Sequence, residues 1–108
     1  MLFRSWIHHL TDDEIAGLDA ALGSLASLGR RFPDFDRGHF PIGPLGAALP
    51  AFAVALENGR GFLLLRGLPV ERYSDDQLKA VYYGIGLHLG TPVRQNPRGD
   101  LQIGRAHV

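Results

Sequence analysis

Residues 59–67 read Gly-Arg-Gly-Phe-Leu-Leu-Leu-Arg-Gly, and this stretch decides the fold. Four consecutive apolar residues bounded by glycines are typical of a β-strand, so the pattern predicts a strand over residues 61–66. Successive side chains of a strand point to opposite faces. An unbroken apolar run therefore indicates a strand that is covered on both sides.

Capping boxes mark the starts of two helices on either side of this strand. Residues 11–14 read Thr-Asp-Asp-Glu, in which the hydroxyl and the carboxylate can each accept the other residue's backbone N–H. Apolar residues recur at helical spacing after this box, and Gly29 is typical of the position that follows a helix. Residues 74–77, Ser-Asp-Asp-Gln, predict a second such helix that ends at Gly90.

The remaining segments carry weaker signals. Residues 45–57 predict a helix that is interrupted or begun afresh at Pro50. The proline-rich residues 32–44 predict irregular chain, held to the core by phenylalanines. Residues 93–96 predict a short strand, and residues 6–7, Trp-Ile, are expected to pack on the first helix.

Composition excludes several classes of protein. The 108 residues suit one small domain or a piece of a larger one. Lys plus Arg and Asp plus Glu both number 11, so no net charge favours nucleic acid or an anionic membrane as partner. There is no cysteine, which excludes disulfides and thiolate metal sites. The longest apolar run is far shorter than the roughly 20 residues of a membrane helix, and the start lacks a signal-peptide pattern. We expect a cytoplasmic bacterial protein.

The C-terminal residues 103–108 have a different origin in our interpretation. Ile-Gly-Arg-Ala-His-Val back-translates to ATC GGA AGA GCA CAC GTC, which resembles a common sequencing adapter read in frame. We therefore take residues 1–102 as the native part and expect the natural protein to continue past Leu101. His107 is then not a candidate ligand.

Glycines, histidines and acids do not form a catalytic or metal pattern within the chain. The glycines of residues 84–90 lie in a predicted helix rather than between a strand and a helix, so they favour close packing against the sheet over nucleotide binding. The acid pairs 12–13 and 75–76 lie in first helical turns, where they complement the helix dipole. None of the histidines has metal-ligand spacing, and structural roles are expected for them. These are His8, His9, His39 and His88.

Three polar residues follow apolar strands and are candidates for a site. Arg66 ends the strand of residues 61–66, where its guanidinium can hold a carboxylate in a bidentate way; a structural acid is the favoured partner. Gln95 and Asn96 follow the approach Thr-Pro-Val, and their amides can bind a polar ligand or satisfy neighbouring backbone groups.

Between residues 6 and 101 the chain resembles the N-terminal part of the TauD/TfdA family. These proteins are non-haem iron(II), 2-oxoglutarate-dependent dioxygenases with a clavaminate-synthase-like fold. Residues 59–70 are similar to the family's Gly-x-Gly-Phe-x-x-x-Arg-Gly strand. The other segments that match in order and spacing are residue 6 and residues 10–15, 40–42, 73–78, 83–93, 95–96 and 99–101.

The resemblance implies an α+β chain that forms the N-terminal helices and first strands of a double-stranded β-helix, or jelly roll. It implies an oxidoreductase that uses Fe(II), 2-oxoglutarate and O₂ to oxidise a small organic substrate, with release of succinate and CO₂. The family's iron ligands, a His-x-Asp/Glu pair and a distal His, and its later 2-oxoglutarate arginine are expected after Leu101.

The resemblance therefore assigns no catalytic or metal residue to this chain, which we expect to be inactive alone and to bind neither cofactor. Gln95 and Asn96 are expected to line the substrate or cosubstrate pocket. The alternative is a stand-alone α/β module that binds or interacts without catalysis. A module should melt cooperatively, whereas a fragment should expose apolar sheet surface.

Overall fold

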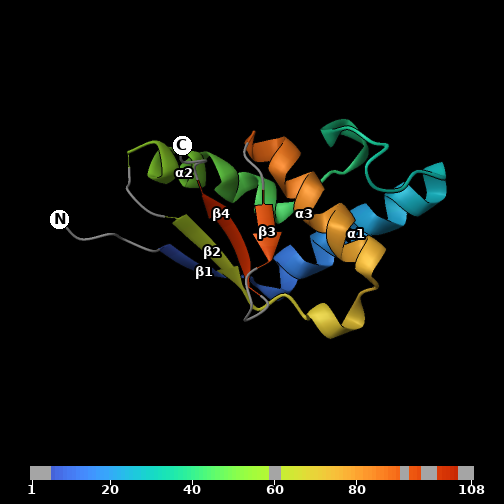
Figure 1. Ribbon diagram of the computed structural model, residues 1–108, viewed down its shortest axis with the longest axis horizontal. Helices are drawn as coiled ribbons and strands as arrows, with labels where there is room; N and C mark the ends of the chain where they lie inside the picture. The colour runs from blue at the N-terminus through green and yellow to red at the C-terminus, as the bar shows by residue number, and fades with distance from the viewer. Residues whose placement is uncertain (1–5, 59–61, 91–92, 96–99, 105–108) are drawn as a thin grey trace.

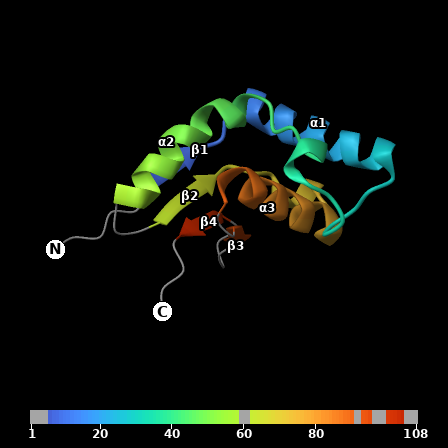
Figure 2. The ribbon, with the colours of Figure 1, turned by 90° about the horizontal axis from the view of Figure 1, so that it is seen from above.

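A computed structural model describes residues 6–58, 62–90, 93–95 and 100–104 of the chain. Within these residues the fold is α+β: three helices pack against a mixed four-stranded sheet (Figures 1 and 2). The elements in chain order are β1 (Trp6–His9), α1 (Asp12–Leu28), η1 (Arg37–His39), α2 (Pro44–Asn58), β2 (Phe62–Arg66), η2 (Val70–Arg72), α3 (Asp75–Leu89), β3 (Val93–Gln95) and β4 (Leu101–Gly104).

The predicted strand of residues 61–66 is confirmed as β2, and it lies inside the sheet. The strand order is β1-β2-β4-β3, with β1 parallel to β2 and the other two pairs antiparallel. The predicted short strand is confirmed over Val93–Gln95, and Asn96 lies outside the described residues. Strands β1 and β4 were not predicted.

The helices cover one face of this sheet (Figure 2). Leu65 and Leu101 are paired across β2 and β4, are fully buried, and belong to the same apolar core as residues of α1 and α3. Leu64 is also buried, but its row on the other face includes Ile7, which is 47% exposed. Leu63, Leu64 and Leu65 are therefore buried as predicted, whereas the described chain places helices on only one of the two faces of β2.

The two capping boxes are confirmed atom by atom. The Glu14 N–H donates to the Thr11 hydroxyl over 3.1 Å, and the Thr11 N–H donates to the Glu14 carboxylate over 2.9 Å. Ser74 and Gln77 repeat the reciprocal pair at the start of α3. Gly29 and Gly90 end the two helices in the left-handed conformation that glycine adopts without strain.

Three sequence interpretations need correction. Pro50 lies inside a continuous α2 and does not interrupt it. The helix buries Leu45, Leu49 and Phe52 on one side. Tertiary packing of this side overrides the missing proline hydrogen bond. The segment Trp6-Ile7, which was expected to pack on the first helix, forms the first half of β1 beside β2, and the Ile7 side chain is 47% exposed.

The third correction concerns the glycines of α3. A Cβ atom built on Gly84 would meet Cδ2 of Phe40 at 2.3 Å, so this glycine permits close packing against a core phenylalanine rather than against the sheet. Phe40 is fully buried, and Phe35 stacks on it with a 5.6 Å separation of ring centroids. Two of the three phenylalanines in residues 32–44 thus anchor the segment as predicted, whereas Phe32 is 37% exposed.

Strand β4 includes residues that we interpret as foreign. Ile103 pairs with both Leu63 and Val93 and is fully buried. A strand of this kind accepts any β-branched apolar residue at an inward position. The proposed boundary at residue 102 stays a prediction, and residues 105–108 lie outside the described part of the chain.

Candidate functional site

Two of the three sequence-predicted candidates, Arg66 and Gln95, lie at the same end of the sheet. Strand β2 ends at Arg66, β3 ends at Gln95, and β4 begins after Asp100. Gln95 pairs in register with Leu101, its side chain is exposed, and it lies on the edge strand. It is therefore open to a ligand at this end, and its predicted partner Asn96 lies outside the described residues.

Arg66 pairs with a structural acid, as the sequence favoured. Its Nε lies 3.3 Å from Oδ1 of Asp100 and its Nη2 lies 3.1 Å from Oδ2. Asp100 is buried, while the Arg66 side chain is 35% exposed. Two parallel N–H···O bonds give such a pair a fixed orientation. The guanidinium thus fixes the position of β4 against β2 beside Gln95.

The Glu14 carboxylate links the end of β1 to the start of α1. Its oxygens lie 2.8 and 3.1 Å from Nε2 of His8, and it also closes the capping box. The His8 ring packs edge-on against Phe52 of α2. Burial raises the pKa of Glu14, but the Thr11 amide and His8 outweigh burial and hold it below its ordinary value of 4.5. The buried carboxylate therefore joins β1 to the start of α1, and the His8 ring extends the contact to α2.

A second cluster joins η2 to α1. The Tyr73 hydroxyl donates to Oδ1 of Asp19 over 2.5 Å, and Nη2 of Arg72 lies 3.3 Å from Oδ2 of the same residue. Burial, followed by this hydrogen bond, raises the pKa of Tyr73 to about 12. Since the acceptor is 54 residues away in the chain, local sequence patterns do not reveal the contact.

Three of the four histidines in the described residues, His8, His39 and His88, form hydrogen bonds within the protein. His9 is exposed, and Nδ1 of His39 accepts the Asp36 N–H over 3.0 Å. Nε2 of His88 donates to the Phe40 carbonyl over 2.7 Å, a specific contact beyond the predicted helix-dipole effect. Among the residues that the structure describes, no three His, Asp or Glu side chains come together as a metal site would require.

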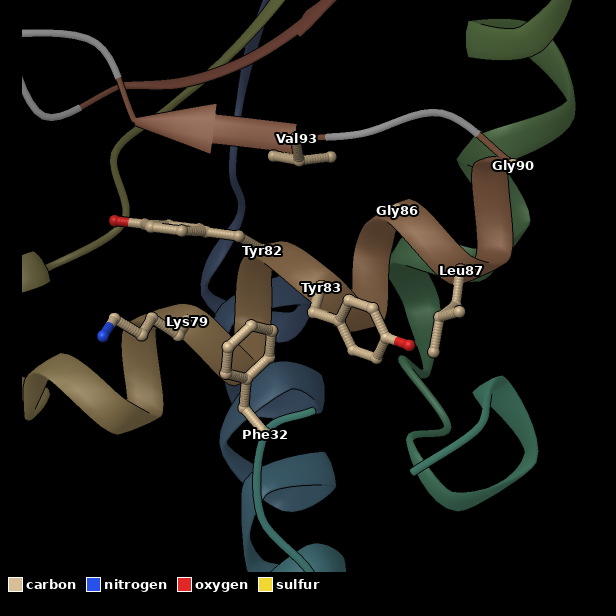
Figure 3. A pocket seen from close by; sticks show the side chains of 8 residues that line it. All are labelled: Phe32, Lys79, Tyr82, Tyr83, Gly86, Leu87, Gly90 and Val93. Atoms are coloured by element: carbon tan, nitrogen blue, oxygen red, sulfur yellow. The ribbon is translucent and has the colours of Figure 1, made fainter. Parts of the chain in front are cut away.

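An apolar groove of about 570 Å³ runs along α3 and was missed by the sequence interpretation (Figure 3). Phe32 packs edge-on against Tyr83 at its wall, with ring centroids 5.2 Å apart. The sequence does contain a pattern that indicates this groove. Helix α3 carries apolar residues not only on the side that faces the core but also on a second side. The lining residues are Phe32, Lys79, Tyr82, Tyr83, Gly86, Leu87, Gly90 and Val93.

The described surfaces can bind but show no catalytic constellation. Arg66 forms an ion pair with Asp100, Glu14 is hydrogen-bonded to His8 and Thr11, and His39 and His88 are hydrogen-bonded to backbone groups. The exposed Gln95 amide and the groove therefore remain as candidate contact surfaces. In the described ranges, moreover, no helix has the length and apolar character needed to cross a membrane.

Comparison with known proteins gives one informative similarity. No family model matches the chain. The chain is 33% identical over 95 residues to FR-33289 synthase of Streptomyces rubellomurinus. The match covers 88% of this chain and 28% of the synthase, so the chain spans less than a third of the length of this curated relative. The synthase is what the chain is similar to over these residues.

Proposed function

We propose that this chain is the N-terminal part of a cytoplasmic Fe(II)- and 2-oxoglutarate-dependent dioxygenase of the TauD/TfdA type. The complete enzyme would oxidise a small organic substrate with O₂, most simply by hydroxylation, and release succinate and CO₂. The observation that carries the proposal is the similarity to a biosynthetic synthase over 88% of this chain. The ordered family segments around residues 59–70 supply the reaction class.

The described residues do not provide a site for iron. Since they bring no three suitable side chains together, the proposal places the iron ligands and the 2-oxoglutarate arginine in the remainder of the enzyme. No chemical step is assigned to the residues of this chain. Their role in the proposal is to build the helix-covered end of a larger sheet and to present Gln95 at its polar end.

The test uses the longer reading frame of the source gene. The polypeptide is purified free of metal and incubated with Fe(II), 2-oxoglutarate and O₂, and succinate is measured without any second substrate. We expect succinate release that requires added Fe(II) and is abolished by an alanine in the His-x-Asp/Glu motif. A folded long polypeptide that releases no succinate under these conditions contradicts the proposed reaction.

Gln95 has a matched control on its own strand. Arg94 is also exposed, but its side chain points to the opposite face of β3. In the long polypeptide, Gln95→Ala should raise the KM for 2-oxoglutarate or for the second substrate, whereas Arg94→Ala should leave both unchanged. Equal effects of the two substitutions contradict a pocket role for Gln95.

A further inference from the structure

The helix-free face of the sheet carries two polar side chains where β1 and β2 end. His8 contacts Glu14 of α1, so the next residue, His9, points to the opposite, helix-free face. Leu65 lies in the core that the helices share, so Arg66 points to the helix-free face in the same way. Parallel pairing places His9 opposite Arg66. The imidazole and the guanidinium therefore start from paired positions on strands that are about 4.8 Å apart.

The ion pair with Asp100 uses only one edge of the Arg66 guanidinium. Nε and Nη2 contact the two carboxylate oxygens over 3.3 and 3.1 Å, which is a side-on arrangement. A guanidinium has five N–H donors, and in the described ranges Nη1 has no hydrogen-bond partner. The Arg66 side chain is 35% exposed. A ligand can therefore reach the second edge, formed by Nη1 and Nη2, while the first edge holds the side chain in place.

His9 supplies a further donor on the same face. It is exposed, and no other residue in the described part of the chain forms a hydrogen bond or ion pair with its side chain. An imidazole has an N–H donor in both of its charge states. Because Asp100 offsets much of the charge of Arg66, recognition at this place depends on the directions of the N–H groups more than on net charge.

We propose that the second edge of the Arg66 guanidinium and the His9 imidazole bind the oxyanion group of a small organic acid, a carboxylate or a phosphate-type group. The planar fork of a guanidinium matches two oxygens of such a group. It has no acceptor atom, which excludes a cation as the ligand of this edge. The inference rests on the proposed function, in which the acidic group belongs to the second substrate of the dioxygenase.

The test measures anion binding by the 108-residue chain without Fe(II) or 2-oxoglutarate. Sodium acetate and inorganic phosphate are separate probes of the two oxyanion types, and sodium chloride keeps the ionic strength constant. NMR spectra follow the side-chain N–H signals of Arg66 and His9. We expect both residues to respond to acetate, to phosphate or to both along one saturating curve. Shifts that do not saturate, or that chloride alone reproduces, overturn the proposal.

Two variants distinguish a specific site from general attraction by positive charge. His9→Val removes the donor and keeps a residue that favours strands, and it should weaken binding by about tenfold, the effect of one hydrogen bond to a charged group. Arg37→Gln removes an exposed cation from η1 and should leave binding unchanged. Equal weakening in the two variants overturns the proposal.

The long polypeptide provides a second measurement if the 108-residue chain does not fold alone. A ligand that binds the folded state raises the midpoint of thermal unfolding. At constant ionic strength, acetate or phosphate should raise the midpoint of the metal-free long polypeptide more than that of its His9→Val variant. Equal shifts overturn the proposal. Binding that is present in the 108-residue chain and absent from the long polypeptide also overturns it, because another part of the enzyme then occupies the guanidinium edge.

These outcomes are separable from failure of the proposed function, because neither measurement uses Fe(II) or 2-oxoglutarate. A long polypeptide that binds the anion but releases no succinate retains the oxyanion site and loses the dioxygenase assignment. A long polypeptide that releases succinate but binds neither anion retains the dioxygenase assignment and loses the oxyanion site.

Discussion

Arg66 and Asp100 form a two-point ion pair between strands that are 34 residues apart in the chain, with N···O distances of 3.3 and 3.1 Å. The pair joins the end of β2 to the start of β4. It lies at the end of the sheet that also presents Gln95. The position of the candidate contact residue therefore depends on this pair.

Removal of the guanidinium should destabilise the protein. Arg66→Gln removes the two-point ion pair with the buried Asp100 carboxylate, and we expect a loss of about 1 to 3 kcal/mol, reduced from a fully buried pair by solvent at the arginine. The measurement is the free energy of urea unfolding. The double variant Arg66→Gln/Asp100→Asn should recover part of the loss, and strictly additive effects of the two substitutions would contradict a direct coupling.

Acid should weaken the junction of β1 with α1. The pKa of Glu14 is held below 4.5 in the folded protein, so its stabilising effect is present above pH 4.5 and is lost as the pH falls through the folded value. Glu14→Gln should therefore lower stability at pH 7 and reduce the dependence of stability on pH below 4.5. The exposed Glu71→Gln serves as the control in the same titration. If stability depends on pH in the same way in both variants, the lowered pKa of Glu14 is contradicted.

Alkaline pH should weaken the contact of η2 with α1. Because the pKa of Tyr73 is raised from 10.0 to about 12, its contribution is complete below pH 10 and is lost as the pH rises toward 12. Tyr73→Phe should cost about 1.5 to 3 kcal/mol at pH 7, the usual range for a hydrogen bond to a charged group. A phenolate absorbance titration of the folded protein checks the pKa, and an ordinary midpoint near 10 for every tyrosine would contradict it.

A methyl group on Gly84 should disrupt the packing of α3 on Phe40. The added Cβ would lie 2.3 to 2.8 Å from three ring atoms, and the fully buried ring has little room to move. We expect Gly84→Ala to cost about 1 to 3 kcal/mol by overpacking. Gly23→Ala is the control, because nothing lies within 4 Å of its Cβ position inside α1, and it should stabilise the protein by about 0.5 to 1 kcal/mol. Thermal unfolding measures the stability of both variants. If Gly84→Ala leaves the stability unchanged, the close contact with Phe40 is contradicted.

The sequence correctly predicted those helices and strands that are specified by residues within or next to them. The capping boxes at Thr11 and Ser74 and the apolar run of β2 lie within a few residues of the structure that they specify. Strand β1 was missed because Trp-Ile-His-His is short and acquires its strand geometry by pairing with β2. Strand β4 was missed because residues 103 and 104, the second half of the strand, were interpreted as foreign. Pro50 shows that helix packing can outweigh a local helix-breaking signal.

The candidate site was predictable only in part. Gln95 could be placed at a strand end from the residues that precede it, and Arg66 could be expected to hold an acid, but the partner Asp100 depends on strand pairing between distant segments. The groove combines α3 with Phe32 and Val93, which are distant from each other in the chain. A surface built from such distant segments cannot be predicted from the periodicity of any one of them.

The most direct test of the central claim is long-read sequencing of the source DNA across the codon for Leu101, by a method that adds no adapter of the resembling sequence. We predict that the reading frame diverges from residues 103–108 and continues through a His-x-Asp/Glu motif and a distal histidine. A genuine stop codon directly after Val108 would contradict it, because the iron ligands of the proposed dioxygenase would then not exist in this protein.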